Sequence, residues 1–325
     1  GGGMSYSGGY LPEADGALAL DMTDLTRVRE IDAAARTVTV EAGCTWAALH
    51  EALAAKGLRT PFFGPLSGIV ATVGGALSQN GAFFGSTAHG YAADSVVGLE
   101  IVDGTGRLHR IGAWGAGRAP GLPRFGPDLV GPFLGDCGAL GVKTAAVLRL
   151  IPAPPAPRFA SFAFQDAGAL LNAMAALRDV PHLAELWAFD IEAHRNLART
   201  GFTVLEAAEM AAGVAGGAGS VVKAARHLIS AATMRRAVLA ELPWSLHAVI
   251  EPPLATLADP VEAALHDTCA AAGGTSIADT IPRVTRSRPF RTIKALIGPE
   301  GERWLPCHGV VPAGRAGLAL GRSLI

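Results

Sequence analysis

The sequence has few of the features that mark several common protein classes. Its four cysteines are far apart in the sequence and form no C-x-x-C pair. This spacing indicates neither a zinc knuckle nor a disulfide framework. We therefore expect reduced, mostly buried thiols in a cytoplasmic protein. The 27 Lys and Arg residues are balanced by 28 Asp and Glu residues, so the chain lacks the basic excess that nucleic-acid binding requires. No apolar run reaches the roughly 18 residues of a membrane-spanning helix. We therefore expect no nucleic-acid partner and no membrane span.

Two common phosphate-binding motifs are also missing. No glycine directly precedes Lys-Ser or Lys-Thr as in a P-loop, and no strand is followed by the G-x-G-x-x-G pattern of a Rossmann fold. The chain instead has 41 glycines, and the first cluster is Gly1-Gly2-Gly3-Met4-Ser5-Tyr6-Ser7-Gly8-Gly9. A main chain without side chains lets several N–H groups approach an anion. A flexible linker is the alternative interpretation of this run.

The second glycine-dense segment, residues 61–91, has few charges and no helical or strand periodicity. Short polar side chains stand between its glycines, namely Thr72, Ser78, Gln79 and Asn80. We interpret the segment as a long, turn-rich loop that suits a flat ligand with several heteroatoms. Ordinary surface turns are the alternative, but they seldom continue for about thirty residues with so little charge.

Hydrophobic periodicity predicts regular elements around this segment. We expect strands at 18–21, 37–42, 96–103 and 142–151, a hairpin that pairs 96–103 with 108–111, and a helix from the N-cap Thr45 to Gly57. In the second half we expect helices at 166–178, 227–242 and 260–272 and strands at 244–250 and 303–311. The proline-rich segment 152–157 predicts a boundary between domains of residues 1–155 and 156–325. Residue 1 already lies inside a motif and no cap follows the last strand, so we expect a chain truncated at both ends.

Five blocks occur in an order that resembles a known family. They are the glycine run that ends in Ser, V-T-V-E-A-G-C-T-W, A-T-V-G-G-x-x-x-x-N-G, D-S-V-V-G-L-E-I-V-D-G-x-G, and G-D-C-G-A-L-G-V-K-T. This order is similar to that of FAD-linked oxidoreductases of the vanillyl-alcohol oxidase and p-cresol methylhydroxylase type, which include glycolate oxidase subunits and D-lactate dehydrogenases. The resemblance is dense over residues 1–152 and loose beyond. It implies an α+β fold: a FAD-binding domain of two α/β subdomains, then a cap domain whose antiparallel sheet is flanked by helices.

The resemblance also implies which residues meet the FAD. The pyrophosphate would lie against Gly1, Gly2, Gly3, Met4, Ser5 and Gly8. The rest of the cofactor would lie beside Pro65, Thr72, Gly74, Gly75, Ser78, Gln79, Asn80, Gly138, Gly141 and Val142. We expect non-covalent FAD, because Met4 stands where some members carry a histidine tether, and a tether from the cap domain is the alternative. The last block departs from the family at Cys137, where an acidic residue is usual.

Three residues are candidates for catalysis. His89 would line the substrate pocket from the loop on the flavin side, and His308 would act as a base or an orienting group from a cap strand. Arg315 would grip a substrate carboxylate, a role that is also open to Arg288, Arg291 and Arg303. Structural histidines and ordinary surface arginines are the alternatives.

The other histidines indicate no further chemistry. We expect His182, His194, His227 and His266, on or near predicted helices, to face solvent. Metal-dependent family members carry an H-G-D-G-N motif, of which only His308-Gly309 is present. We therefore expect no metal site.

The reaction implied by the resemblance is the transfer of a hydride from a small hydroxylated substrate to flavin N5, while a protein base accepts the hydroxyl proton. Oxygen or another acceptor would then reoxidise the flavin. A 2-hydroxy acid is favoured over a para-substituted phenol or aryl alcohol, because a phenolate site would need Tyr or Arg and all three tyrosines lie in the first half. A flavin-binding fragment without turnover is a third alternative. The sequence does not determine the substrate, the electron acceptor or whether the chain forms a homo-oligomer.

Overall fold

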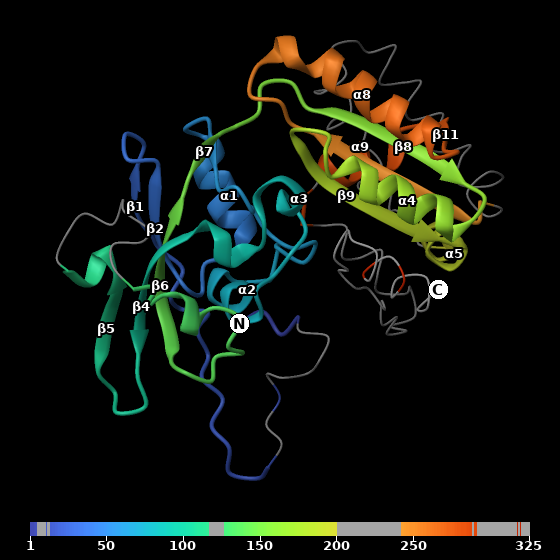
Figure 1. The fold of residues 1–325 in the computed structure, drawn as a ribbon. Coiled ribbons are helices and arrows are strands. Elements are labelled where there is room, and N and C mark those ends of the chain that lie inside the picture. The colour runs from blue at the N-terminus through green and yellow to red at the C-terminus, as the bar shows by residue number, and fades with distance from the viewer. Residues whose placement is uncertain are drawn as a thin grey trace. The chain divides into compact units, whose positions relative to one another are not determined.

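The computed structural model describes residues 1–4, 11, 14–116, 127–199, 242–287, 289–290, 317 and 319. The chain divides into two compact units, Gly1–Ala153 and Pro154–Ile325, and the division falls inside the proline-rich segment (Figure 1). Both units combine helices with antiparallel sheets, which confirms the expected α+β class. The strand expected at 303–311, and all but the last residue of the helix expected at 227–242, lie outside the described residues.

Unit 1 contains a five-stranded antiparallel sheet with the order β1-β2-β6-β4-β5. The strands are β1 (Val28–Asp32), β2 (Thr37–Glu41), β6 (Val142–Arg149), β4 (Val96–Val102) and β5 (Leu108–Gly112). The β4–β5 hairpin is as predicted, and its turn is closed by Asp103, whose carboxylate accepts from the N–H groups of Thr105 and Arg107. The chain after β6 leaves this sheet, because β7 (Ile151–Pro152) pairs instead with β3 (Leu58–Arg59).

One predicted strand of unit 1 is wrong. Residues 18–21 form no strand, and Leu18 and Leu20 are 93% and 67% exposed. The first strand is β1, whose residues show little apolar alternation but pair with β2 in antiparallel register. A strand needs a partner for its main-chain groups, and a short apolar run does not supply one.

The helices of unit 1 are short, and the first of them has a side-chain cap. In α1 (Trp46–Ala54) the Thr45 hydroxyl accepts from the N–H of Ala48 at 3.2 Å, and Trp46, Leu49 and Leu53 form the buried stripe that the sequence predicts. The chain then turns at Gly57, where φ is +66°. The remaining helical segments are α2 (Val73–Gln79), α3 (Ser86–His89), η1 (Ala92–Ser95), η2 (Ala113–Ala116) and η3 (Gly131–Phe133).

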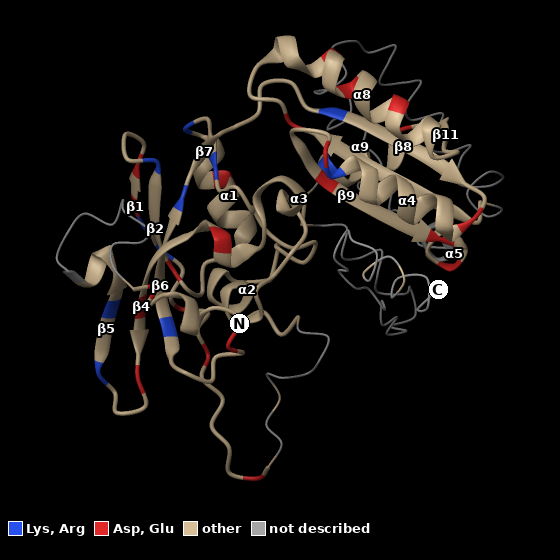
Figure 2. Ribbon diagram, in the orientation of Figure 1, with Lys and Arg blue, Asp and Glu red and all other residues tan. Residues whose placement is uncertain are grey.

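A ladder of ion pairs crosses this sheet, where Figure 2 shows basic and acidic residues on neighbouring strands. The buried carboxylate of Glu41 accepts from Arg27 and Arg29 at 2.9 and 3.2 Å. Arg29 also binds Glu100 at 3.0 Å, and Arg110 binds Glu100 at 3.1 Å. The hydrogen bond from Arg27 is the main cause that lowers the pKa of Glu41 to about 2.

Unit 2 contains a four-stranded antiparallel sheet with the order β11-β8-β10-β9. The strands are β8 (Arg158–Phe164), β9 (Leu183–Asp190), β10 (Trp244–Ile250) and β11 (Thr275–Ile277). The helical segments are α4 (Ala167–Leu177), α5 (Ile191–Arg199), η5 (Ala255–Leu257), α8 (Ala258–Ala271) and α9 (Thr280–Ser287). Strand β10 has the predicted bounds, and α4 begins as predicted at Asp166, whose carboxylate accepts from the N–H of Ala169 at 2.9 Å.

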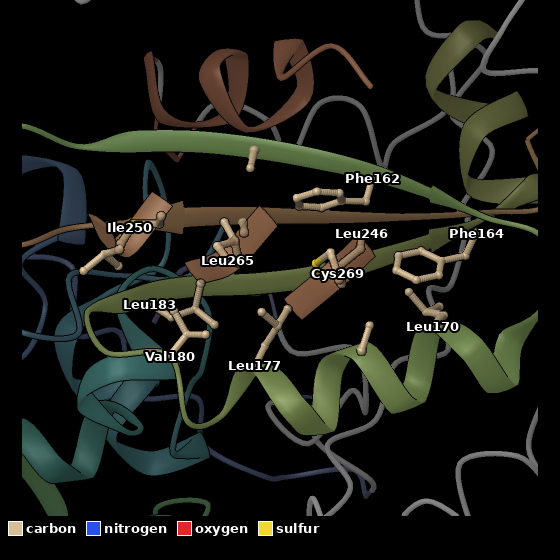
Figure 3. Packing of buried hydrophobic residues seen from close by; sticks show 14 residues of the cluster. Phe162, Phe164, Leu170, Leu177, Val180, Leu183, Leu246, Ile250, Leu265 and Cys269 are labelled. Carbon is tan, nitrogen blue, oxygen red and sulfur yellow. The ribbon is translucent and has the colours of Figure 1, made fainter. Parts of the chain in front are cut away.

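The apolar core of unit 2 lies between one face of this sheet and the helices α4 and α8 (Figure 3). Phe162 and Phe164 of β8 pack there with Leu170 of α4 and Leu265 of α8. Full burial of each such side chain contributes roughly 1.5–3 kcal/mol. Burial raises the pKa of the Cys269 thiol to about 12, so this cysteine acts as a packing residue.

The opposite face of the sheet carries buried polar groups. Arg286 of α9 binds Glu185 of β9 at 2.6 Å and also binds Glu251, which follows β10. Burial opposes the charge of Arg286, but the two carboxylates raise its pKa above the ordinary value. His194 of α5 also lies on this face and is fully buried, so the prediction that it faces solvent is wrong. Its ring is held by Ser245 of β10, a partner that lies 51 residues away in the sequence.

Candidate cofactor site

Helix α2 forms inside the segment that the sequence analysis interprets as a loop. Its N-cap is Thr72, whose hydroxyl accepts from the N–H of Gly75 at 3.2 Å. Two glycines in the first turn disfavour a helix by about 1 kcal/mol each, and they hide it from periodicity. The helix is supported by its neighbours, since the N–H groups of Val73 and Gly74 donate to main-chain carbonyls of residues 42–44 at 2.8 Å.

Gly74 is required by packing. A Cβ at this position would lie 2.7 Å from the Cβ of Ala42, at the end of β2. The glycine thus lets α2 lie directly against the strand end. The predicted contact of Gly74 with FAD stays a prediction beside this packing role.

The N-terminal end of α2 meets the first glycine cluster, and in Figure 1 the N-terminus lies beside this helix. A Cβ at Gly2 would lie 2.0 Å from the carbonyl oxygen of Val70, and a Cβ at Gly1 would lie 3.2 Å from the hydroxyl of Thr72. Only a bare main chain fits so close to this segment. Two blocks separated by about seventy residues in the sequence therefore lie side by side.

The C-terminal end of α2 meets the last of the predicted cofactor blocks. The carbonyls of Leu77 and Ser78 accept from the N–H groups of Gly135 and Cys137, both at 2.9 Å. Asn80 caps the helix in a left-handed conformation with φ of +47°. Helix α2 thus links the first, third and fifth blocks of the sequence.

Asp136 shapes the last block and is a residue that sequence reasoning missed. Its buried carboxylate accepts from Lys143 Nζ at 2.6 Å and from the N–H groups of Gly138 and Leu140 at 3.0 and 3.2 Å. Burial alone would raise the pKa of this carboxyl, but Lys143 and the two N–H groups lower it below the ordinary value. An aspartate two residues before a glycine is a recognised turn signal. Cys137, where the resembled family has an acid, is exposed.

The loops that carry Pro65 and His89 are fixed to each other by a short bridge. The N–H of Phe63 donates to the carbonyl of Phe84 at 3.2 Å, and the N–H of Phe84 donates to the carbonyl of Gly64 at 3.1 Å. The rings of Phe63 and Phe84 stack with centroids 5.1 Å apart. His89, the last residue of α3, is half-buried and belongs to the same unit as the glycine blocks.

The glycines of these blocks differ in what surrounds them. Apart from neighbouring main chain, a Cβ at Gly75 would meet the hydroxyl of Thr72 at 3.1 Å, and a Cβ at Gly138 would meet no described atom within 4 Å. A Cβ at Gly141 would lie 3.1 Å from Ile101 Cδ1, a contact as close as the one at Gly75. Bare main chain open to a ligand is what a pyrophosphate needs for close approach. Gly138 is therefore open enough for such an approach, and its contact with a dinucleotide stays a prediction.

The other predicted site residues have mixed outcomes. Gly3, Met4, Gln79 and Val142 lie in the same unit as the open glycines, whereas Ser5, Gly8, His308 and Arg315 lie outside the described residues. The arginines 288, 291 and 303 also lie outside them. Contact of any of these residues with FAD or substrate stays a prediction. Among the described residues no group of three or more His, Cys, Asp or Glu side chains could hold a metal ion, and no helix is long and apolar enough to cross a membrane.

Comparisons with known proteins point to the same half of the chain. Residues 1–112 match the model of the FAD binding domain family. The glycolate oxidase subunit GlcD of Bacillus subtilis is 32% identical over 154 residues, which are 47% of this chain and 31% of that protein. The D-2-hydroxyglutarate dehydrogenase of Xanthomonas citri pv. viticola is 30% identical over 178 residues, which are 55% of this chain and 36% of that protein. The chain thus spans about a third of the length of these curated relatives.

Solved structures show the likeness of fold over most of the chain. Alkyldihydroxyacetonephosphate synthase matches with a TM-score of 0.64 and 18% identity, covering 91% of this chain and 52% of that one. The crystal structure of p-cresol methylhydroxylase with substrate bound matches with a TM-score of 0.62 and 16% identity, covering 88% of this chain and 54% of that one. At these identities the matches bear on the fold alone.

Proposed function

We propose that the chain, whose residues 1–112 match the FAD binding domain family, takes part in the FAD-linked oxidation of a small hydroxylated substrate, with a 2-hydroxy acid favoured. When bound, FAD supplies the acceptor for the substrate's hydride. The observation that carries the proposal is the convergence of three separated glycine blocks on α2.

The chain's own residues would hold the cofactor mainly through the main chain. Gly1, Gly75 and Gly138 carry no side chain that would keep the cofactor away from the main chain, although the N–H groups of Gly75 and Gly138 already donate to Thr72 and Asp136. Thr72 and Asp136 hold the conformation of these segments, because the first caps α2 and the second closes the turn around Gly138. We keep non-covalent binding as part of the proposal.

The names of the relatives favour the substrate class. A glycolate oxidase subunit and a D-2-hydroxyglutarate dehydrogenase are both named for 2-hydroxy acids. For this class we propose Arg315 as the group that binds the carboxylate and His308 or His89 as the group that accepts the hydroxyl proton. An alkylphenol or aryl alcohol is the second candidate, and a flavin-binding part without turnover is the third.

The setting of the reaction belongs to the same proposal. Cys44, Cys137 and Cys269 are free thiols, which supports a reducing, cytoplasmic compartment. Burial raises the pKa of the Cys44 thiol to about 11, so this residue is unreactive at neutral pH. Oxygen or another acceptor would take the electrons, and the oligomeric state is left to measurement.

The test is an anaerobic titration of the purified chain, reconstituted with FAD and desalted, with glycolate, D-lactate, D-2-hydroxyglutarate and 4-methylphenol. We expect flavin absorption bands that persist after desalting and bleach with a 2-hydroxy acid. Bleaching by 4-methylphenol alone would favour the alkylphenol candidate. Bands without bleaching would identify a binder, and a colourless protein without thermal protection by FAD would overturn the proposal. The same titration on a longer parent protein, where one exists, distinguishes a missing segment from a missing activity.

A further inference from the structure

A buried ion pair lies next to an exposed turn in unit 1. The side chains of Asp136 and Lys143 are only 4% and 3% exposed, and Lys143 Nζ lies 2.6 Å from Asp136 Oδ1. The four residues that follow Asp136, here called the stretch 137–140, are all exposed. Because the loss of hydration offsets much of the attraction in a buried ion pair, its effect is to be sought in the conformation that it fixes.

All four N–H groups of the stretch 137–140 are already hydrogen-bonded. The pairs are Gly138 and Leu140 with the carboxylate of Asp136, at 3.0 and 3.2 Å, Ala139 with the carbonyl of Asp136, at 2.9 Å, and Cys137 with the carbonyl of Ser78, at 2.9 Å. A ligand can approach Gly138 closely, but an anion finds no available N–H donor on this stretch.

The carbonyl oxygens of the same stretch have the opposite state. In the described part of the chain no hydrogen bond is accepted by the carbonyls of Cys137, Gly138, Ala139 and Leu140. Each of these oxygens has two lone pairs. The stretch can therefore accept hydrogen bonds from a ligand, and the groups that match it are hydroxyl and amino groups rather than phosphate.

The backbone of this stretch has an unusual conformation that its partners fix. Cys137 has a φ of +54° and Gly138 a φ of +81°. A residue other than glycine keeps a left-handed conformation where its surroundings determine it. The Asp136 carboxylate supplies two hydrogen bonds to the stretch, and Lys143 holds that carboxylate in place.

A second turn of unit 1 shows what the ion pair adds. In the β4–β5 hairpin the carboxylate of Asp103 also accepts from two N–H groups, and a Cβ at Gly106 would also meet no described atom within 4 Å. Asp103 is 30% exposed, and its partner His109 is 47% exposed. A surface turn is thus closed without a buried charge. The buried Lys143 at the other turn points to a requirement beyond closing it.

The stretch 137–140 also belongs to the part of unit 1 that is predicted to meet the cofactor. It is attached through Ser78 to α2, and the segment at the other end of this helix meets Gly1 and Gly2. Lys143 itself cannot bind a phosphate without leaving Asp136, because its side chain is buried and bonded there.

We propose that Asp136 and Lys143 are positioning residues for FAD. The pair presets the stretch 137–140, so that its carbonyl oxygens accept hydrogen bonds from hydroxyl or amino groups of the cofactor, while the pyrophosphate lies elsewhere. The proposal rests on the proposed function, because it needs FAD in unit 1. It adds to that function the chemical groups of the cofactor that this stretch binds.

The first test compares FAD affinity, measured by titration, with the thermal stability of the apo chain. Asp136→Ala combined with Lys143→Met leaves no buried charge without a partner, but the N–H groups of Gly138 and Leu140 lose their acceptor. We expect FAD to bind about tenfold more weakly, because the stretch is then ordered only when FAD binds. Asp136→Asn combined with Lys143→Met restores an uncharged acceptor and should bind FAD more tightly than the Ala variant.

Asp103→Ala is the matched control, because it removes the same kind of acceptor from the hairpin turn. It should bind FAD like the parent. If the folded Ala variant bound FAD as tightly as the parent, or if the Asn variant bound no better than the Ala variant, the positioning role would be overturned and the proposed function would stand. A parent chain that binds no FAD would overturn both.

The second test uses the parent chain alone, so it does not depend on the folding of any variant. We expect FAD to shift the carbonyl carbon-13 NMR resonances of the stretch 137–140 downfield, while the N–H groups of Gly138 and Leu140 stay protected from hydrogen exchange. Inorganic pyrophosphate alone should leave these carbonyl resonances unchanged. Carbonyl resonances that do not respond to FAD, or that respond to pyrophosphate in the same way, would overturn the proposal.

Discussion

In unit 1 the buried carboxylates of the sheet, Glu41 and Glu100, are paired with arginines that reach into solvent, and Arg27 is 78% exposed. In unit 2 the sheet buries two neutral imidazoles, linked by Ser245, and a largely buried group of Arg286 with two glutamates. Solvent screens the exposed arginines of the first sheet, whereas the Arg286 side chain is only 14% exposed and its two carboxylates are buried, so screening is weaker there. Pairs of arginine with glutamate are therefore expected to contribute different amounts to the stability of the two units.

The largest expected effect concerns the enclosed arginine. Arg286→Leu would leave Glu185 and Glu251 buried without this partner, and breaking a buried ion pair costs about 3–5 kcal/mol. We expect the free energy of unfolding of unit 2 at pH 7 to fall by this amount. The measurement is hydrogen exchange of peptides from unit 2 at increasing urea concentration. Arg195→Leu, which removes an exposed pair with Glu192, is the control and should change it by less than about 1 kcal/mol. If both variants lowered the free energy of unfolding by the same amount, burial would not determine how much these ion pairs contribute to stability.

The second effect is a difference in the pH at which each unit loses stability. His247 has an unfolded pKa of 6.5 and a folded pKa of about 3, so below pH 6.5 the unfolded state binds more protons and unit 2 loses stability down to about pH 3. For one proton the slope approaches about 1.4 kcal/mol per pH unit. Glu41, lowered from 4.5 to about 2, stabilises unit 1 above pH 4.5 and loses this contribution between pH 4.5 and 2.

Hydrogen exchange of peptides from β10 and β6 between pH 7 and 4, corrected for the intrinsic rate, measures this difference. Protection of β10 should fall from pH 6.5 downward, and that of β6 should persist to about pH 4.5. In His247→Gln the pH dependence of β10 should be weaker. Parallel loss of protection in both strands would contradict the assignment of neutral histidines to unit 2.

The third effect separates packing glycines from open ones within unit 1. Gly74→Ala would press against Ala42 and should destabilise the unit by about 1–3 kcal/mol, as overpacked core positions do. Gly75→Ala is the matched variant, because its new methyl group meets only the Thr72 hydroxyl, at 3.1 Å. We expect Gly75→Ala to keep the thermal stability of the apo chain and to weaken FAD binding, measured by titration. If Gly75→Ala bound FAD as tightly as the parent, Gly75 would not be part of the FAD site.

The smallest effect concerns the exposed end of the ion-pair ladder. Arg27→Ala should cost less than about 1 kcal/mol, and the cost should shrink further in 1 M salt. Arg29→Ala should cost more, because Arg29 is less exposed and bridges Glu41 and Glu100. A larger cost for Arg27 than for Arg29, from denaturant unfolding, would contradict the assumed role of exposure.

Prediction from the sequence succeeded where the signal is local. The cap Thr45, the stripe of α1, the β4–β5 turn and the strand β10 each depend on a few consecutive residues. The convergence of glycine blocks was expected from the resemblance, although α2 was not, because its helix depends on carbonyls of residues 42–44 rather than on its own sequence.

Prediction failed where the signal is a contact between distant residues. The partners of His194 and Asp136 come from other elements, so neither burial could be read from the neighbouring residues. The same holds for β1, which is a strand because β2 lies beside it, and for the exposed segment at 18–21, which has no such neighbour among the described residues.

Helix α2 also fixes the distance between two segments of unit 1. Its seven residues, at about 1.5 Å of rise each, set the separation between the segment that meets Gly1 and the segment that meets Cys137. One inserted residue would turn one end against the other by about 100° and lengthen the rod, so both attachments could not be kept at once. Length variation in this half of the molecule is therefore to be sought in the hairpin turn after β4 and not between Thr72 and Asn80.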